Sequence, residues 1–85
     1  MQIGVQWTDT MSPHAVIDYY TWGWPPALDV VWMITPTTPA PGIPQVEWMI
    51  AVERSSATAV TYHITVTNIS GNPVAIEGRY GILNA

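Results

Sequence analysis

The chain has 85 residues, of which 48% are hydrophobic and only 9% are charged, and it contains no cysteine. This length predicts one small domain, and the formal net charge of −4, with two basic residues in total, leaves no cationic surface for the phosphates of a nucleic acid. Without cysteine there is no disulfide, and two histidines alone cannot complete a structural zinc site of the usual kind.

The first part of the chain predicts strands separated by irregular segments. Residues 2–8 alternate apolar and polar side chains, as a half-buried strand does. Residues 14–21 are rich in β-branched and aromatic side chains and predict a second strand, a single helical turn capped by Ser12 being the alternative. A rigid irregular loop is expected at residues 22–26. Residues 28–35 are apolar on both faces, which predicts a strand that is central or covered by a partner subunit.

A proline-rich connector follows at residues 35–44. Four prolines fall within nine residues there, namely Pro36, Pro39, Pro41 and Pro44. Proline lacks a backbone N–H, so this segment is expected to be extended and polyproline-like, outside any sheet interior. At about 3.1 Å per residue it spans roughly 30 Å, enough to cross the end of a sandwich or to reach a neighbouring subunit.

The second half of the chain shows a regular two-residue alternation. Residues 45–53, 60–67 and 74–83 each alternate apolar and polar side chains, and polar or Gly/Asn-containing connections separate them. Consecutive strands with short connections usually pair with one another. This half therefore predicts a three-stranded antiparallel meander.

The expected loops set the register of this meander. A loop at 68–72 places His63 opposite Glu77 and Thr61 opposite Arg79. A loop at 54–58 makes Glu53 face Ala59 and sets Met49 beside His63. The predicted outer face then consists of Glu47, Thr61, His63, Thr65, Thr67, Glu77 and Arg79.

Five or six strands in a chain this short predict an all-β fold, a small antiparallel β-sandwich or partly open barrel, as a single domain over residues 1–85. A core of this size stabilises a fold by only a few kcal/mol, so small domains usually need a disulfide, a metal or a partner. Five tryptophans and four tyrosines also leave little polar material to cover the surface. We therefore expect a homo-oligomer.

Aromatic side chains concentrate in residues 19–24. Rigid rings beside polar groups suit a sugar, because ring faces cover its C–H surface while polar atoms fix its orientation. The candidate ligand-binding residues are Tyr19, Tyr20, Trp22 and Trp24. The alternative is that these rings fill the core or a subunit interface, for which the candidate residues are Val31, Trp32, Met33, Pro39 and Pro41.

No catalytic, metal or cofactor site is predicted. Cysteine and lysine are absent, and Ser12, His14 and Asp18 lie too close in sequence for a catalytic triad without unusual folding. His63 with Glu77 would be an exposed cross-strand pair on a flat sheet, which offers no cleft that excludes water. The chain is therefore expected to be non-enzymatic.

Targeting signals are not apparent. The longest apolar runs, residues 30–34 and 48–52, are far shorter than the roughly 20 residues of a membrane span, and residues 1–7 do not resemble a signal peptide. Residues 68–70 spell a glycosylation sequon, although a role in the turn also explains the asparagine. The compartment stays open.

Two functional hypotheses follow from this pattern. The first is a lectin-like binding module in which a homo-oligomer presents several weak aromatic glycan sites. The second is a structural self-assembly module in which the aromatic residues form the subunit interface. A protein-directed adaptor that uses the proline-rich segment is a third possibility.

Overall fold

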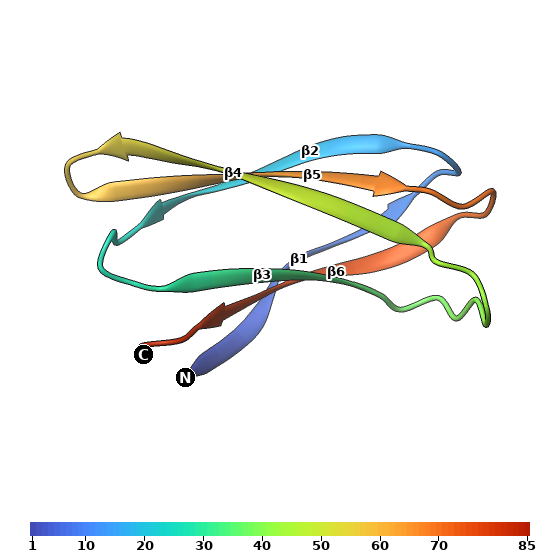
Figure 1. Cartoon of the computed structure of the whole chain (residues 1–85), viewed down its shortest axis with the longest axis horizontal. Coiled ribbons are helices and arrows are strands. Elements are labelled where there is room, and N and C mark those ends of the chain that lie inside the picture. Colours follow the sequence, from blue (N-terminus) through green and yellow to red (C-terminus); the bar gives the residue numbers. More distant parts are fainter.

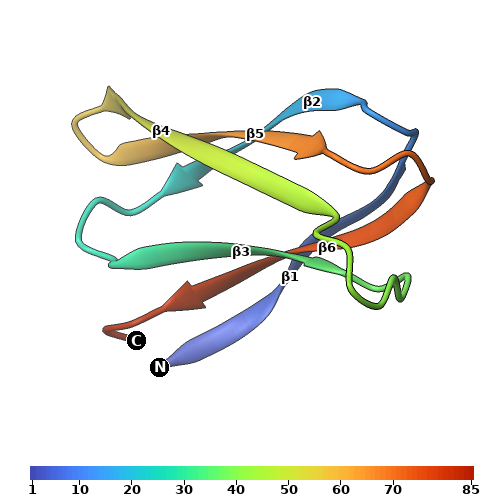
Figure 2. The same ribbon diagram turned by 45° about the vertical axis from the view of Figure 1, so that its right-hand side comes forward.

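The computed structural model describes all 85 residues and contains six β-strands and no helix (Figure 1). The strands are β1 (Gln2–Met11), β2 (Val16–Trp24), β3 (Val30–Pro36), β4 (Val46–Ser56), β5 (Ala59–Asn68) and β6 (Val74–Ile82). They form two antiparallel three-stranded sheets, in the orders β1-β6-β3 and β2-β5-β4. The two sheets lie over one another as the layers of a sandwich (Figure 2). The predicted all-β sandwich is confirmed.

The last three strands are where the pairing differs from the prediction. β4 and β5 form the expected hairpin, whereas β6 crosses to the other sheet and lies between β1 and β3. His63 is therefore not opposite Glu77, and Thr61 is not opposite Arg79; both of these predicted pairs are wrong. The physical reason is that alternation determines which face of a strand is buried, but it does not determine the neighbour with which the strand pairs.

The β4–β5 hairpin has a tighter turn than predicted. β4 continues to Ser56 through an irregularity, and Glu53 pairs with Thr61, two positions further along β5 than expected. Arg54 stabilises this turn, because its Nε donates to the Ser56 carbonyl (3.1 Å) and its Nη2 donates to the Ala57 carbonyl (2.9 Å). A shift of two residues leaves every side chain on its predicted face.

Strands β1 and β2 are longer than the sequence pattern indicates. β1 does not end at residue 8 but continues to Met11, whose side chain is fully buried. β2 runs through the segment expected to be a loop and ends at Trp24. A β-bulge between Thr21 and Trp24 makes this possible, with Gly23 at a φ of 78° that other residues rarely adopt.

β3 is an edge strand and pairs only with β6. Its inward-facing Trp32 and Ile34 are buried, whereas Val31 and Met33 on the other face are exposed. Of the two expected positions, the central one is therefore wrong, and cover by a partner subunit stays a prediction. Pro36 is the last residue of the strand and pairs with β6. An edge strand tolerates proline because one of its sides has no neighbouring strand that would need an N–H donor.

The connector between β3 and β4 crosses the end of the sandwich (Figure 2). It is attached to β6, because the Thr37 N–H donates to the Ala75 carbonyl (2.8 Å) and the Ala75 N–H donates to Thr38 Oγ1 (3.0 Å). Its conformation is only partly extended, since the Ile43 N–H donates to the Ala40 carbonyl and closes a turn. The predicted connector is therefore bent and docked on its own sandwich.

The core fills the space between the two sheets. Nine buried side chains form it: Met11, Trp32, Ile34, Val60, Tyr62, Ile64, Val66, Val74 and Ile76. Gly78 of β6 lies directly under the ring of Trp7, and a Cβ at this position would be 2.5 Å from ring atoms. The absence of a side chain at Gly78 thus lets a large indole pack flat on the sheet.

A buried asparagine joins two connections at one end of the sandwich. Asn68 has no exposed surface, and its Nδ2 donates to the carbonyls of Met11, Ser12 and Asn72 at 3.4, 3.1 and 2.8 Å. Its Oδ1 accepts hydrogen bonds from the backbone N–H (3.0 Å) and the hydroxyl (2.8 Å) of Ser70. The side chain of the sequon asparagine is thus occupied within the fold and holds the turn.

Candidate functional site

Strand alternation, together with the β-bulge between Thr21 and Trp24, divides the four aromatic ligand candidates into two pairs. Tyr20 and Trp22 point out from the β2-β5-β4 sheet and are 64% and 70% exposed. Tyr19 and Trp24 point inward and pack against the core. The structure thus brings two of the four together on the surface and uses the other two inside.

The outward pair extends into a small exposed cluster. The ring centroids of Tyr20 and Trp22 are 5.7 Å apart, and Tyr20 stacks on the imidazole of His63 at 6.3 Å. His63 Nε2 lies 2.7 Å from Oε1 of Glu53 on β4. When Nε2 carries a proton, His63 donates a hydrogen bond to this carboxylate. We call Tyr20, Trp22 and His63 the aromatic face.

Polar groups and a shallow hollow border the aromatic face. Asp18 lies two residues before Tyr20 on the same side of β2, and its Oδ1 accepts a hydrogen bond from the Thr65 hydroxyl at 2.8 Å. A hollow of about 400 Å³ is lined by Tyr20 and Trp22 of β2 and by Gln6 of β1, among others. Ring faces and hydrogen-bond acceptors therefore lie within one small area.

The inward pair has a structural role. Trp24 packs against Trp32, Tyr62 and Tyr80 with centroid distances of 5.5 to 6.4 Å, and its Nε1 donates to Thr21 Oγ1 at 2.9 Å. A ligand on the outer face cannot reach the Trp24 ring, whereas Tyr19 also lines the hollow of about 400 Å³. A two-residue alternation separates Tyr19 from Tyr20 and Trp22, but it also places Trp24 on the outer face, and only the bulge turns Trp24 inward.

Tyr19 links the two sheets at the β1/β2 side of the sandwich. Its hydroxyl donates to Asp9 Oδ2 at 2.7 Å, and its ring lies 4.9 Å from that of Trp7. Burial, followed by the hydrogen bond to Asp9 and its negative charge, raises the pKa of Tyr19 well above its usual value. Burial and the charge of Asp29 also raise the pKa of Tyr62. Both phenols are therefore neutral at physiological pH.

The residues predicted for an oligomer interface are also divided. Trp32 is 7% exposed and belongs to the core of its own chain. Val31 and Met33 are 48% and 58% exposed on the outer face of the β1-β6-β3 sheet, and Pro39 and Pro41 are exposed in the connector. Four of the five candidates are thus accessible to a partner, and they lie on different parts of the surface.

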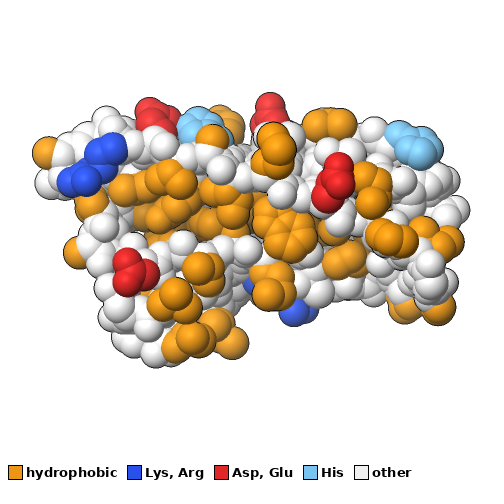
Figure 3. Space-filling model, viewed as in Figure 1, with side chains coloured by type: hydrophobic (Ala, Val, Ile, Leu, Met, Phe, Trp, Pro, Cys, Tyr) orange, Lys and Arg blue, Asp and Glu red, His pale blue; other side chains and the backbone are white.

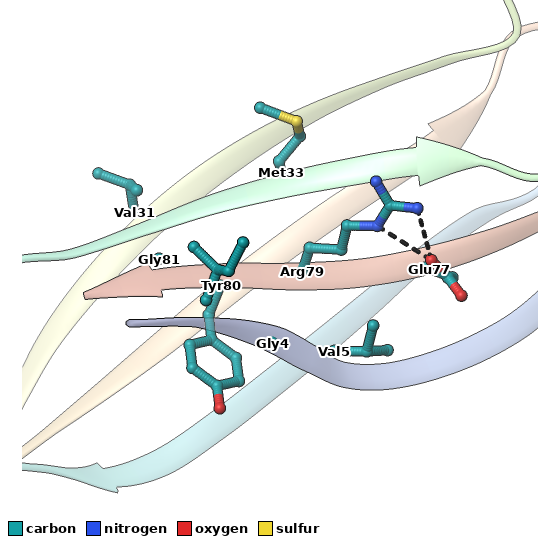
Figure 4. Close-up of a pocket in the computed structure, with 9 residues that line it drawn as sticks. Gly4, Val5, Val31, Met33, Glu77, Arg79, Tyr80 and Gly81 are labelled. Atoms are coloured by element: carbon teal, nitrogen blue, oxygen red, sulfur yellow. Dashed lines mark hydrogen bonds and ion pairs between the residues drawn. The ribbon is translucent and has the colours of Figure 1, made fainter. Parts of the chain in front are cut away.

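Val31 and Met33 form one wall of an apolar groove of about 490 Å³ on that outer face (Figure 4). Val5 of β1 lies on the other wall, and Gly81 of β6 provides a floor without a side chain. The ion pair between Arg79 and Glu77 lies along the floor, with Nη2 2.6 Å from Oε1. Glu77 therefore pairs along its own strand, and not with His63 as predicted.

The sandwich is open on the side where β3 and β4 are the edges. β4 turns Trp48, Ile50 and Val52 toward the opposite sheet, as the alternation predicts, yet they are 36%, 40% and 65% exposed because little of that sheet covers them. Apolar side chains gather in a long band on this side (Figure 3). We call this surface, formed by the edges of β3 and β4, the open side; the sequence shows that these residues are apolar, but not that they are uncovered.

Other features of the chain add no further site. No group of three or more His, Cys, Asp or Glu residues is arranged to hold a metal ion. The structure has no helix long and apolar enough to cross a bilayer. No protein-family model, curated protein or solved structure matches the chain. The function is therefore inferred from the surface chemistry alone.

Proposed function

We propose that this chain is a non-enzymatic, homo-oligomeric binding module of lectin-like type, and that the aromatic face contacts a neutral glycan. The observation that carries the proposal is the adjacent exposure of Tyr20 and Trp22 on the outer face of the β2-β5-β4 sheet, beside His63. Apolar rings of this size are rarely left exposed as neighbours without a partner.

The chemistry of the surroundings supports a sugar over other small ligands. Ring faces cover the C–H surface of a pyranose, and the carboxylates of Asp18 and Glu53 accept hydrogen bonds from hydroxyl groups. The net charge of −4 disfavours glycans that carry sialic acid or sulfate. A single shallow site binds weakly, so several copies in one oligomer raise the overall affinity.

Binding of the wild-type chain to a panel of neutral and acidic glycans tests the proposal, followed by calorimetry on the best ligand. Trp22→Ala should weaken binding about tenfold or more, because it removes a stacking surface worth roughly 1.5 kcal/mol. Trp22 is 70% exposed, so thermal unfolding and molar mass should hardly change. Met33→Ala, an exposed apolar truncation on the other sheet, is the matched control and should bind normally.

Two results would overturn this proposal. One is a wild-type chain that binds no glycan on the panel. The other is a Trp22→Ala variant that binds as well as the Met33→Ala control. A Trp22→Ala variant that dissociates or unfolds would assign the ring to assembly.

The second candidate function is structural self-assembly, and the open side favours it. Trp48, Ile50 and Val52 expose apolar surface that a folded chain normally covers. If assembly completes the fold, the melting temperature should rise with protein concentration. A melting temperature that is constant over a hundredfold range would count against this candidate.

A further inference from the structure

We propose that the open side is the contact surface for a second copy of this chain, and that the two copies join edge to edge through β4. This inference rests on the homo-oligomer in the proposed function and adds the location and geometry of the contact. The pairing would extend each β2-β5-β4 sheet into one antiparallel sheet of six strands.

β4 has the least protected edge of the sandwich. β1 and β2 are each interrupted by an irregularity within the strand, and β3 has seven residues and ends at Pro36. β4 has eleven residues and pairs regularly with β5 from Val46 to Glu53. A long regular edge without proline or lysine leaves its free N–H and C=O groups available to another strand.

The two sides of the sandwich differ in how the sheets are joined. At the β1/β2 side, the Tyr19–Asp9 hydrogen bond bridges the sheets. No side-chain hydrogen bond joins β3 to β4, and the apolar Trp48, Ile50 and Val52 are left there with large exposed fractions. A second copy would cover these side chains and pair the edge in one contact.

The open side has the area that a stable dimer needs. The face seen in Figures 1 and 3 measures 42 by 24 Å between Cα extremes, or about 1,000 Å². Specific interfaces bury about 800 Å² on each partner, which a face of this size can accommodate. Residues 48–52 within it carry no charge, although the whole chain carries −4.

Symmetry limits how β4 can pair with itself. A two-fold axis perpendicular to the sheet leaves every side chain on the same face of the sheet as before the rotation. Residues that pair across the axis must therefore face the same way, and because side chains alternate, their two residue numbers must add to an even number. With Met49 on the axis, Trp48 is opposite Ile50 of the second copy and Val46 is opposite Val52. This arrangement sets the inward-facing apolar side chains directly against one another.

The neighbouring registers are less favourable. With Ile50 on the axis, Glu47 would be opposite Glu53 of the second copy, and like charges directly opposite destabilise a sheet. With Ala51 on the axis, Trp48 would be opposite Arg54 of the second copy, which places a charged group against an inward-facing apolar side chain. With Trp48 on the axis, Val52 would be opposite Pro44, which lies outside β4. We therefore assign Met49 to the axis.

Light scattering on two matched lysine variants tests the surface. Val52 and Val16 are 65% and 61% exposed and lie on edge strands of the same sheet, β4 and β2, so Val52→Lys and Val16→Lys disturb the folded monomer to a similar extent. The wild type and Val16→Lys should have twice the chain mass of 9.4 kDa at concentrations of about 100 µM, and Val52→Lys should have the single mass. A wild type that stays at 9.4 kDa, or a Val52→Lys variant that associates like Val16→Lys, would overturn the proposal.

Cysteine cross-linking tests the register, since the chain has no cysteine of its own. Residues paired on the axis have Cα atoms about 4.5 to 5.5 Å apart, within the range that a disulfide spans. Met49→Cys should therefore form a covalent dimer on oxidation, whereas Thr10→Cys on the edge of β1 should not. If Met49→Cys forms an oligomer but does not cross-link on oxidation, the β4 pairing is contradicted, whatever the mass of the oligomer.

The two proposals can fail separately. A Trp22→Ala variant that loses glycan binding but remains a dimer supports the glycan site on the aromatic face and leaves the β4 contact unaffected. A Val52→Lys monomer that keeps single-site glycan binding but loses multivalent binding supports the β4 contact. A monomeric wild type that binds glycan would reject the contact and retain the glycan site.

Discussion

Replacing Asn68 by alanine should destabilise the fold more than its size suggests. The substitution removes four hydrogen bonds, two donated by the Nδ2 protons, which the carbonyls of Met11, Ser12 and Asn72 share, and two accepted from Ser70. At about 1 kcal/mol each, with the longest bond counting for less, the free energy of unfolding should fall by about 3–4 kcal/mol. A chain of this length is stable by only about 4–13 kcal/mol, so the loss is a large fraction of the total.

Urea denaturation at one fixed protein concentration measures this effect. With a slope of roughly 1.5 kcal/mol/M, the midpoint of Asn68→Ala should be about 2–3 M lower than that of the wild type. Asn72→Ala is the matched control, because its exposed side chain makes no hydrogen bond, and it should change stability by less than about 0.5 kcal/mol. Asn68→Asp keeps the Ser70 bonds but turns an acceptor toward carbonyl oxygens, so it should be at least as unstable. If Asn68→Ala falls within about 1 kcal/mol of the control, the hydrogen bonds do not carry the stability assigned to them.

Two further predictions concern packing and pH. Gly78→Ala places a Cβ 2.5 Å from the ring of Trp7 and should lower the free energy of unfolding, measured by chemical denaturation, by about 1–3 kcal/mol. Gly71→Ala is the control and should be nearly neutral, because the nearest atom to its Cβ is 3.9 Å away. Equal stabilities of the two variants would refute the close packing. Folding raises the pKa of Tyr19 above the usual value of about 10 for a phenol, so the unfolded chain loses this proton first and the free energy of unfolding should decrease as pH rises above about 10. Tyr19→Phe should make that decrease shallower, and an unchanged pH profile would refute the role of the buried phenol.

The strand alternation made the all-β fold and the buried faces predictable. The inward positions of β4 and β5 follow directly from their two-residue period, even though the hairpin register differs by two residues. The partner strands of β6 were not predictable in this way, because a strand with one apolar face can bury that face from a position in either sheet. Pairing with β1 and β3 depends on contacts between residues far apart in sequence.

The candidate site was predicted in part. Tyr20 and Trp22 lie on the surface as a ligand site requires, while alternation turns Tyr19 inward and the β-bulge turns Trp24 inward. The sequence pattern missed this division because Gly23 resembled a loop residue, although it allows the strand to continue through a bulge. Whether an apolar strand is covered depends on the position of the other sheet, and the strand's own residues do not determine that position.

The order of the strands has a consequence for how the chain folds during synthesis. Only the β4–β5 connection stays within one sheet, so this hairpin is the one unit that can form early from local contacts, within microseconds. β1 pairs with β6, and Gln2 is aligned with Ile82. At about 5–20 residues per second, β1 must wait several seconds on the ribosome for its partner strand, with its apolar residues exposed. The β1-β6-β3 sheet therefore cannot form until β6 has been synthesised, and this interval is when the chain most needs protection from aggregation.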